Sequence, residues 1–304
     1  MKTIKVLHGV FLCLFINLFG AYGQTSGEGK RNFISFAAAQ ELHEYFTYTG
    51  RNCPLISGHR GGKESGYPEN SIEAFANTLK HTPAFFEIDP RLTKDSVIVL
   101  MHDASLERTT NGHGKLRDLL WKEAQQLYLK DVNGVLTDFK IPSLEEVIVW
   151  SKGKTVVNLD HKDVPMEMTA ALVKRLNAFD HVMITVHDPS EASYYLEQHP
   201  DFMFSAFIRS EEEFKSYEEA GIPWSQIMAY VGPLSKPENQ ALYDQLHAKG
   251  VLVMISAAPS YDKMDNKAEQ FASYRKVFEE GADVLESDYP IEVAKSLEMV
   301  SGVE

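Results

Sequence analysis

Short apolar runs alternate with longer helical patterns from residue 55 to the end of this 304-residue chain, and this alternation is the feature that most constrains the fold. Several runs are apolar almost throughout, as expected for parallel strands that are covered on both faces. Nine strands are predicted, over residues 55–59, 85–89, 97–102, 155–160, 182–186, 202–208, 226–231, 251–256 and 282–287. Strand–helix alternation over this length predicts a (β/α)8 TIM barrel.

Nine strands are one more than such a barrel holds. Only seven residues separate Asp89 from Val97, which is too few for a crossover helix between parallel strands. We therefore expect one strand to be extra, or the barrel to be distorted at this point. A doubly wound sheet is the alternative fold, but no glycine fingerprint follows the first strand to support it.

Residue pairs typical of capping boxes mark the starts of four helices. The pairs are Asn70 with Glu73, Ser143 with Glu146, Asp188 with Glu191, and Ser210 with Glu213. Pro189 would occupy the first helical position after Asp188, where a missing N–H costs nothing.

The first 23 residues have the layout of a secretory signal peptide. Lys2 and Lys5 precede an apolar run over residues 6–19 and small residues at 21–23, as in such peptides. The apolar run is shorter than the roughly 20 residues that a membrane span needs, so an uncleaved anchor is the weaker alternative. We expect cleavage before Gln24 and export to the periplasm or outside the cell.

The 281 residues after position 23 are expected to form one domain, because no internal repeat or low-complexity linker divides them. Residues 24–54 are predicted to be a helical extension, with a helix over 33–48 that closes one end of the barrel. The barrel itself would span residues 55–304. Residues 104–141 form an unusually long connection, which we interpret as a small insertion over one barrel mouth.

The charge and the cysteine content exclude some functions. The formal net charge is −13, and loss of the two lysines in the signal peptide takes it to −15. No basic stripe is present to neutralise the phosphates of a nucleic acid. Cys53 would be the only cysteine after cleavage, so no internal disulfide can form, and we predict a buried, inert thiol.

Two carboxylates, Glu87 and Asp89, alternate on one predicted strand. Residues i and i+2 of a strand point to the same face, roughly 6–7 Å apart, and two acids so placed repel each other unless a cation lies between them. Oxygen ligands favour Mg²⁺ or Ca²⁺. The alternative is an edge strand with two solvated acids, because an isolated E-x-D pattern is a weak signal.

Two histidines, His59 and His102, each end a predicted strand. The C-terminal ends of barrel strands face the active site, and histidine is a common general acid or base. Arg60 precedes Gly61 and Gly62, so its guanidinium can bind phosphate oxygens while the glycines let the backbone approach. The alternatives are structural histidines and a surface salt bridge.

Asp160 and Lys162 share one face at the end of another predicted strand. Asp160 is a candidate third metal ligand, and Lys162 is a candidate phosphate contact. The alternative is an internal ion pair, or a lysine that bridges the barrel acids. Glu69 and Asp103 are candidates for supporting the metal site or the substrate from nearby positions.

An ordered set of motifs resembles the glycerophosphodiester phosphodiesterase family. The matching segments are residues 59–61, 68–71, 87–89, 93–95, 102–103, 106–110 with Gly112 and Gly114, 141–146, 158–162 and 287–290. The resemblance extends from residue 55 to about residue 292. The ordered set is specific, although no single segment is.

The resemblance implies a TIM barrel that uses one divalent cation, Mg²⁺ or Ca²⁺, to hydrolyse glycerophosphodiesters to an alcohol and sn-glycerol 3-phosphate. It implies roles for seven residues: acid–base catalysis by His59 and His102, metal binding by Glu87, Asp89 and Asp160, and phosphate contact by Arg60 and Lys162. The attacking group could be water or the glycerol 2-hydroxyl, and the sequence does not choose between them. The expected partner is a small anionic phosphodiester.

One residue and one short segment depart from the family pattern. Asp160 stands where the family usually has glutamate, and its side chain is one methylene shorter, so the metal would be bound differently, through water, or more weakly. Residues 256–258 replace a tryptophan and an asparagine that the family often has there. The alternatives to a glycerophosphodiesterase are an enzyme for inositol, sugar or lysophospholipid diesters, with residues 119–121 touching lipid, and a non-catalytic phosphate-binding barrel.

Overall fold

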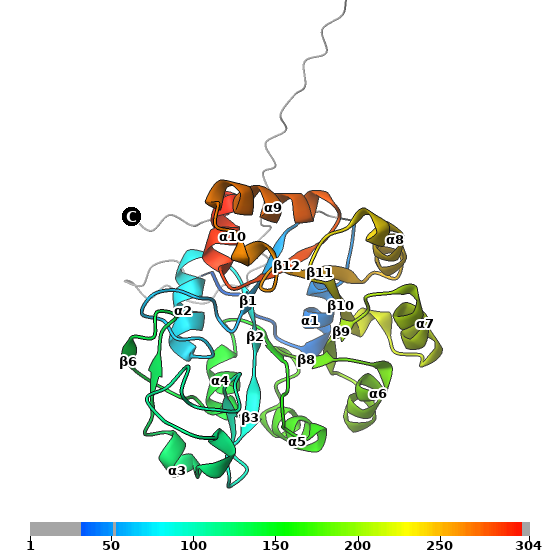
Figure 1. The fold of residues 1–304 in the computed structure, drawn as a ribbon. Helices are drawn as coiled ribbons and strands as arrows, with labels where there is room; N and C mark the ends of the chain where they lie inside the picture. The colour runs from blue at the N-terminus through cyan, green and yellow to red at the C-terminus, as the bar shows by residue number, and fades with distance from the viewer. Residues whose placement is uncertain (1–31, 51–52, 300–304) are drawn as a thin grey trace, which may run out of the picture.

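The computed structural model describes residues 32–50 and 53–299. Within these residues, eight parallel strands close into a barrel in the order β1-β12-β11-β10-β9-β8-β7-β2 (Figure 1). The strands are β1 Leu55–His59, β2 Phe85–Ile88, β7 Val157–Leu159, β8 Val182–Val186, β9 Met203–Phe207, β10 Ile227–Gly232, β11 Leu252–Ser256 and β12 Val284–Ser287. The predicted TIM barrel is confirmed, and the doubly wound alternative is wrong.

One of the nine predicted strands, that at residues 97–102, lies outside the barrel. After β2 the chain forms β3 Pro90–Leu92, turns back, and pairs antiparallel as β4 Ile98–Leu100. The strand predicted at residues 97–102 is therefore real, and it is the extra one. His102 consequently follows a hairpin strand, and its predicted position at the end of a barrel strand is wrong.

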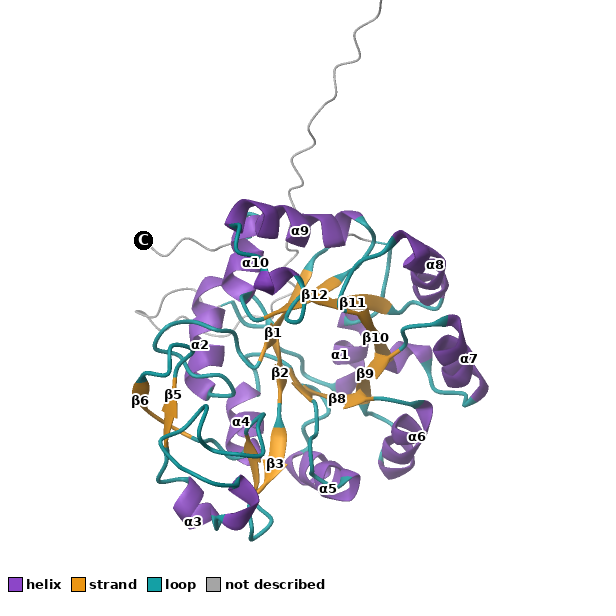
Figure 2. Ribbon diagram, viewed as in Figure 1, coloured by secondary structure: helices purple, strands orange, loops and turns teal. Residues whose placement is uncertain are grey.

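Helices surround the barrel, as Figure 2 shows. They are α2 Ile72–His81, α4 Leu144–Ser151, α5 Met166–Leu176, α6 Pro189–Gln198, α7 Glu211–Glu219, α8 Gln240–Ala248, α9 Lys267–Glu279 and α10 Pro290–Ser296. The N-caps predicted at Ser143, Asp188 and Ser210 are confirmed. The N-cap predicted at Asn70 is wrong, because Ser71 caps α2 by accepting from the N–H of Ala74.

Alternate strand residues face the helices and the barrel lumen. The outward residues, such as Ile56, Ile184 and Val253, belong to the large core between barrel and helices. The lumen is filled at the N-terminal ends of the strands by a second apolar cluster, which includes Phe85. Phe46 packs into this cluster and makes an edge-to-face contact with Phe85, at 5.2 Å between ring centroids.

The helix that supplies this closure is α1, Ala39–Tyr45. It lies within residues 33–48, where a helix was predicted, but it is much shorter than that range. Its Leu42 is fully buried in the same lumen cluster as Phe46. One end of the barrel is therefore closed by apolar packing, which leaves the C-terminal ends of the strands to form the open mouth.

The long connection forms a small flanking unit with its own apolar cluster. Its elements are one 3-10 helix, η1 Leu116–Asp118, one α-helix, α3 Trp121–Ala124, and two strands, β5 Tyr128–Lys130 and β6 Leu136–Lys140. Figure 2 shows this unit beside α2 and α4, to one side of the barrel. Leu119 and Trp121 pack against its core, which argues against a role for them in lipid binding.

Two further expectations concern the chain before β1. Cys53 is exposed, so the predicted buried thiol is wrong. The predicted signal peptide, residues 1–23, lies outside the described residues. Within residues 32–50 and 53–299, no helix has the length and apolar character that a membrane crossing requires.

Candidate active site

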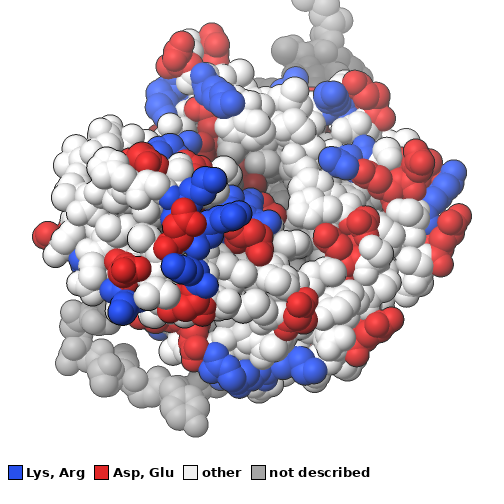
Figure 3. Space-filling model, turned by 60° about the horizontal axis from the view of Figure 1, so that its bottom comes forward, with Lys and Arg blue, Asp and Glu red and all other residues white. Residues whose placement is uncertain are grey.

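Three carboxylates meet at the open mouth of the barrel. Glu87 lies on β2, Asp89 follows that strand, and Asp160 follows the neighbouring strand β7. One oxygen of each lies within 4.8 Å of the others. Figure 3 shows a hollow in the molecular surface, with acidic and basic side chains gathered along one side of it.

Two buried oxygens of this cluster, Glu87 Oε2 and Asp89 Oδ1, accept no hydrogen bond. Asp89 Oδ1 is ion-paired with Lys162 instead, whereas the nearest ion-pair partner of Glu87 Oε2, His59 Nε2, is 3.8 Å away. Burial raises the pKa of Glu87 well above its usual range, and the charges of Asp89, Glu286 and Asp160 add to the shift. A divalent cation would satisfy these oxygens and remove the repulsion, so the donor set fits a hard metal ion.

Two cations lie directly beside Asp89. The Nε of Arg60 is 3.1 Å from Asp89 Oδ2, and the Nζ of Lys162 is 3.0 Å from Asp89 Oδ1. Burial alone would raise the pKa of Asp89, but these two cations outweigh it and lower the pKa. Lys162 also pairs with Asp160, so it bridges the barrel acids, which is the alternative that the sequence left open.

Asn70 holds Asp89 through a reciprocal pair of hydrogen bonds. Its Nδ2 donates to Asp89 Oδ2 at 2.6 Å, and the backbone N–H of Asp89 donates to Asn70 Oδ1 at 3.1 Å. Asn70 adopts a left-handed backbone, φ 58°, a conformation that asparagine tolerates better than most residues. The capping-box pattern predicts a cap at Asn70 and does not reveal this contact with Asp89.

His59 is fixed by a carboxylate from the last strand. Its Nδ1 lies 2.6 Å from Asp288 Oδ1, and its Nε2 lies 3.8 Å from Glu87 Oε2. Asp288 is held in turn, because its N–H donates to Asp262 Oδ2 and its Oδ2 accepts from Lys63, both at 2.6 Å. The imidazole therefore presents Nε2 to the carboxylate cluster. The sequence included Asp288 in a motif without giving it a function.

His102 has a similar partner on its own side of the mouth. Its Nδ1 lies 2.7 Å from Asp103 Oδ1, and Arg108 donates from Nε to Asp103 Oδ2 at 2.6 Å. Arg108 also makes a two-pronged contact with Glu69, which accepts from Arg60 as well. Glu69 and Asp103 thus link His102 to Arg60, and Arg108 is a residue of this network that sequence reasoning missed.

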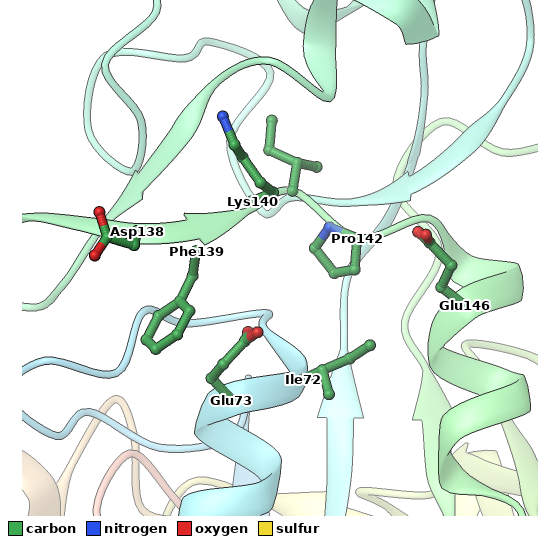
Figure 4. A pocket seen from close by; sticks show the side chains of 8 residues that line it. Ile72, Glu73, Asp138, Phe139, Lys140, Pro142 and Glu146 are labelled. Carbon is green, nitrogen blue, oxygen red and sulfur yellow. The ribbon is translucent and has the colours of Figure 1, made fainter.

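A cavity of about 140 Å³ opens among these groups in the barrel lumen. It is lined by His59, Glu87, Asn158, Asp160, Thr185, Ser205, Phe207, Tyr230, Met254, Ser256 and Glu286. A larger hollow of about 320 Å³ lies between α2, β6 and α4 (Figure 4). The residues predicted from sequence to form the site do not line that hollow, so the smaller cavity is the candidate active site.

The family model for the glycerophosphoryl diester phosphodiesterase family matches residues 59–270. This range contains all of the residues that sequence reasoning placed in the site. The chain belongs to this family. Its members are phosphoric diester hydrolases, which agrees with a mouth that gathers acids, cations and histidines.

Comparison with individual relatives supports this family membership. A glycerophosphoryl diester phosphodiesterase from Parabacteroides distasonis has a crystal structure that is 50% identical, covers 90% of this chain and 97% of its own, and superimposes with a TM-score of 0.87. Glycerophosphodiester phosphodiesterase 1 of Bos taurus is 38% identical, but the match spans only 30% of this chain and 28% of the bovine protein.

A more distant relative shares the fold. An Oleispira antarctica phosphodiesterase, crystallised in complex with the product sn-glycerol-3-phosphate, is 19% identical. It covers 84% of this chain and 99% of its own, with a TM-score of 0.60. At this identity the likeness supports the barrel architecture of the family.

Proposed function

We propose that the protein is a metal-dependent glycerophosphodiesterase that releases an alcohol and sn-glycerol 3-phosphate. The observation that carries the proposal is the convergence of Glu87, Asp89 and Asp160 beside two cations, with a buried oxygen of Glu87 that accepts no hydrogen bond. Family membership supports the reaction class. The sn-glycerol-3-phosphate bound to the Oleispira antarctica phosphodiesterase supports a substrate that contains a glycerol phosphate group.

Glu87, Asp89 and Asp160 would hold one Mg²⁺ or Ca²⁺ ion. Such an ion polarises a non-bridging phosphate oxygen and offsets the charge that develops on it. The donors are carboxylate oxygens, which both ions prefer. The shorter side chain of Asp160 still lies with the other two ligands, so no lengthening of this residue is needed to complete the set.

The remaining groups would bind the phosphate and move protons. Arg60 and Lys162 already flank Asp89, where they can stabilise charge on the phosphoryl oxygens. One histidine of the pair His59 and His102 takes a proton from the attacking group, water or the glycerol 2-hydroxyl, as its oxygen bonds to phosphorus; after attack by the 2-hydroxyl, water must open the cyclic phosphate to give sn-glycerol 3-phosphate. The other gives a proton to the alcohol oxygen as its bond to phosphorus breaks.

The direct experiment is an assay of the purified mature chain with glycerophosphocholine. Release of sn-glycerol 3-phosphate would be followed with a coupled dehydrogenase, first with EDTA and then after Mg²⁺ or Ca²⁺ is restored. We expect turnover only with metal. Binding of the diester without turnover under either metal would favour a non-catalytic barrel. Turnover of a lysophospholipid in micelles, but not of glycerophosphocholine, would favour the lipid alternative.

We also propose that residues 1–23 are a signal peptide and that the enzyme works in the periplasm or outside the cell. The supporting observation is the basic, apolar and small-residue pattern at the start of the chain. Mass spectrometry of the protein from the native cell envelope or medium should find Gln24 as the first residue. An intact Met1 in a cytosolic fraction would contradict the proposal.

A further inference from the structure

A fourth carboxylate, that of Glu286, faces the barrel lumen next to the proposed catalytic groups. Alternate residues of β12 point inward: Val284 lies in the lumen cluster, and Asp288, just beyond the strand, contacts His59. Glu286 therefore points inward between them, and it lines the active-site cavity while only 7% exposed. The proposed metal site and acid–base pair make no use of it.

The partners of Glu286 are hydroxyl groups. Ser57 on β1 and Ser256 on β11 stand in register on the two neighbouring strands. They donate to its two oxygens at 3.3 and 2.9 Å. Among the described residues, no Lys, Arg or His side chain forms a salt bridge with this carboxylate. Burial raises the pKa of Glu286 and outweighs the opposing charge of His59, so a permanent counter-charge would favour its ionised form.

The lining of the cavity is acidic and aromatic. It contains three carboxylates, those of Glu87, Asp160 and Glu286, but neither lysine nor arginine. Two of these acids belong to the proposed metal set. The third, Glu286, has only the His59 imidazole as a basic neighbour in the cavity lining, and the proposed mechanism uses that imidazole for proton transfer. An occupant that carries a positive charge would supply a permanent counter-charge.

Aromatic rings form the cavity wall near Glu286. Phe207 and Tyr230, on the adjacent strands β9 and β10, lie 4.7 Å apart between ring centroids. Arg209 already lies over the Phe207 ring, at 5.1 Å. Within the part of the chain that the structure describes, no cation lies over the Tyr230 ring. An aromatic face beside a carboxylate is a typical environment for a substituted ammonium group.

We propose that Glu286 and Tyr230 select glycerophosphodiesters whose head group carries an ammonium nitrogen. The inference rests on the proposed function, because it concerns the alcohol that leaves from the same site. The carboxylate would supply the charge and the Tyr230 ring would contact the alkyl substituents. The competing occupant is the glycerol arm, whose hydroxyls could also donate to Glu286.

The experiment compares two esters of nearly equal shape. One is glycerophosphocholine, and the other is its neutral carbon isostere, the 3,3-dimethylbutyl ester of glycerol phosphate. We expect the wild-type enzyme to prefer the choline ester. Glu286→Gln should lower kcat/KM for the choline ester on the order of tenfold more than for the isostere, chiefly through KM, since each tenfold corresponds to about 1.4 kcal/mol.

Two further variants make the test decisive. Tyr230→Leu should also reduce the preference for the choline ester, and it tests the proposal independently if Glu286→Gln fails to fold. Asp283→Asn is the matched control, because it removes a buried acid at the opposite end of β12. It should leave the ratio of the two esters unchanged, with folding checked by thermal denaturation.

Each adverse outcome has a distinct meaning. Equal losses on both esters in Glu286→Gln would overturn the inference and assign Glu286 to the glycerol arm. Equal turnover of the two esters by the wild-type enzyme would overturn the inference alone. Failure of the metal-loaded enzyme to hydrolyse either ester would overturn the proposed function together with the inference.

Discussion

His59 Nδ1 lies 2.6 Å from Asp288 Oδ1, although 229 positions separate the two residues in the chain. The contact joins the end of β1 to the end of β12, which are neighbours because the barrel closes. Asp288 is itself anchored by Asp262 and Lys63. The orientation of the proposed catalytic imidazole therefore depends on closure of the whole barrel.

Replacement of Asp288 by asparagine should impair turnover more than binding. The neutral amide accepts a weaker hydrogen bond from Nδ1 than the carboxylate does and offers no charge to the protonated ring, so the ring is held less firmly in its orientation. General acid–base catalysis typically contributes ~10²–10⁴-fold, and we expect Asp288→Asn to lower kcat on the order of 10–100-fold with little change in KM. Steady-state kinetics with a glycerophosphodiester would measure both values.

The control for Asp288→Asn is Asp138→Asn. Asp138 is an exposed acid on β6 that lines the other hollow (Figure 4). This substitution removes the same charge at a distance from His59, so kcat should stay close to that of the wild type. Similar losses in both variants would indicate a general charge effect and would refute a positioning role for Asp288.

Replacement of His102 by alanine should remove one of the two proposed proton-transfer groups. We expect kcat to fall by at least ~10²-fold, while the circular dichroism spectrum and melting temperature stay close to those of the wild type. His113→Ala, on an exposed turn of the insertion, is the matched control and should keep full activity. Near-normal turnover in His102→Ala would end its assignment to catalysis.

Most of the fold could be predicted because the strands carry their own signal. Buried parallel strands such as β8 and β11 are apolar on both faces, and their limits were found to within one residue. The hairpin strand β4 gives the same apolar signal, since it is also fully buried. Periodicity reports burial and not the partner strand, so His102 was placed on a barrel strand.

The site residues were predictable where two of them lie on the same face of one strand. Glu87 and Asp89 were paired by their i, i+2 spacing, and the same rule applied to β12 would have found Glu286 beside Asp288. Other contacts join segments that are far apart in sequence. The salt bridge between Arg108 and Glu69 joins residues 39 positions apart, and no local sequence pattern predicts it.

Replacement of Asp160 by asparagine should weaken metal binding. Loss of one anionic ligand lowers the attraction of the site for a hard divalent ion. Half-maximal activity should therefore require at least roughly tenfold more Mg²⁺ or Ca²⁺ than in the wild type. Asp160→Glu, which restores the length usual in the family, should stay close to the wild type. Identical metal dependence in Asp160→Asn would remove this residue from the ligand set.

Metal removal should also lower stability, independently of activity. Without the ion, Glu87 is buried among like charges, and its pKa is raised. A ligand that binds only the folded state stabilises it by about 2.7 kcal/mol at 100-fold excess over its Kd. Addition of Mg²⁺ or Ca²⁺ to the EDTA-treated protein should therefore raise its melting temperature by several degrees. An unchanged melting temperature at millimolar metal would argue against a site at these carboxylates.

A substitution at the closed end of the barrel should lower stability without lowering the turnover of the folded enzyme. Phe46 is 1% exposed and packs edge to face on Phe85, so Phe46→Ala should lower the free energy of unfolding by roughly 3–5 kcal/mol, the usual cost of such a cavity. Turnover by the folded fraction should persist, because the mouth lies at the other end of the strands. Val149→Ala, at a side chain that is 61% exposed, is the control and should change stability by less than about 0.5 kcal/mol. Equal effects of the two substitutions in urea denaturation would show that Phe46 contributes little to closing the barrel.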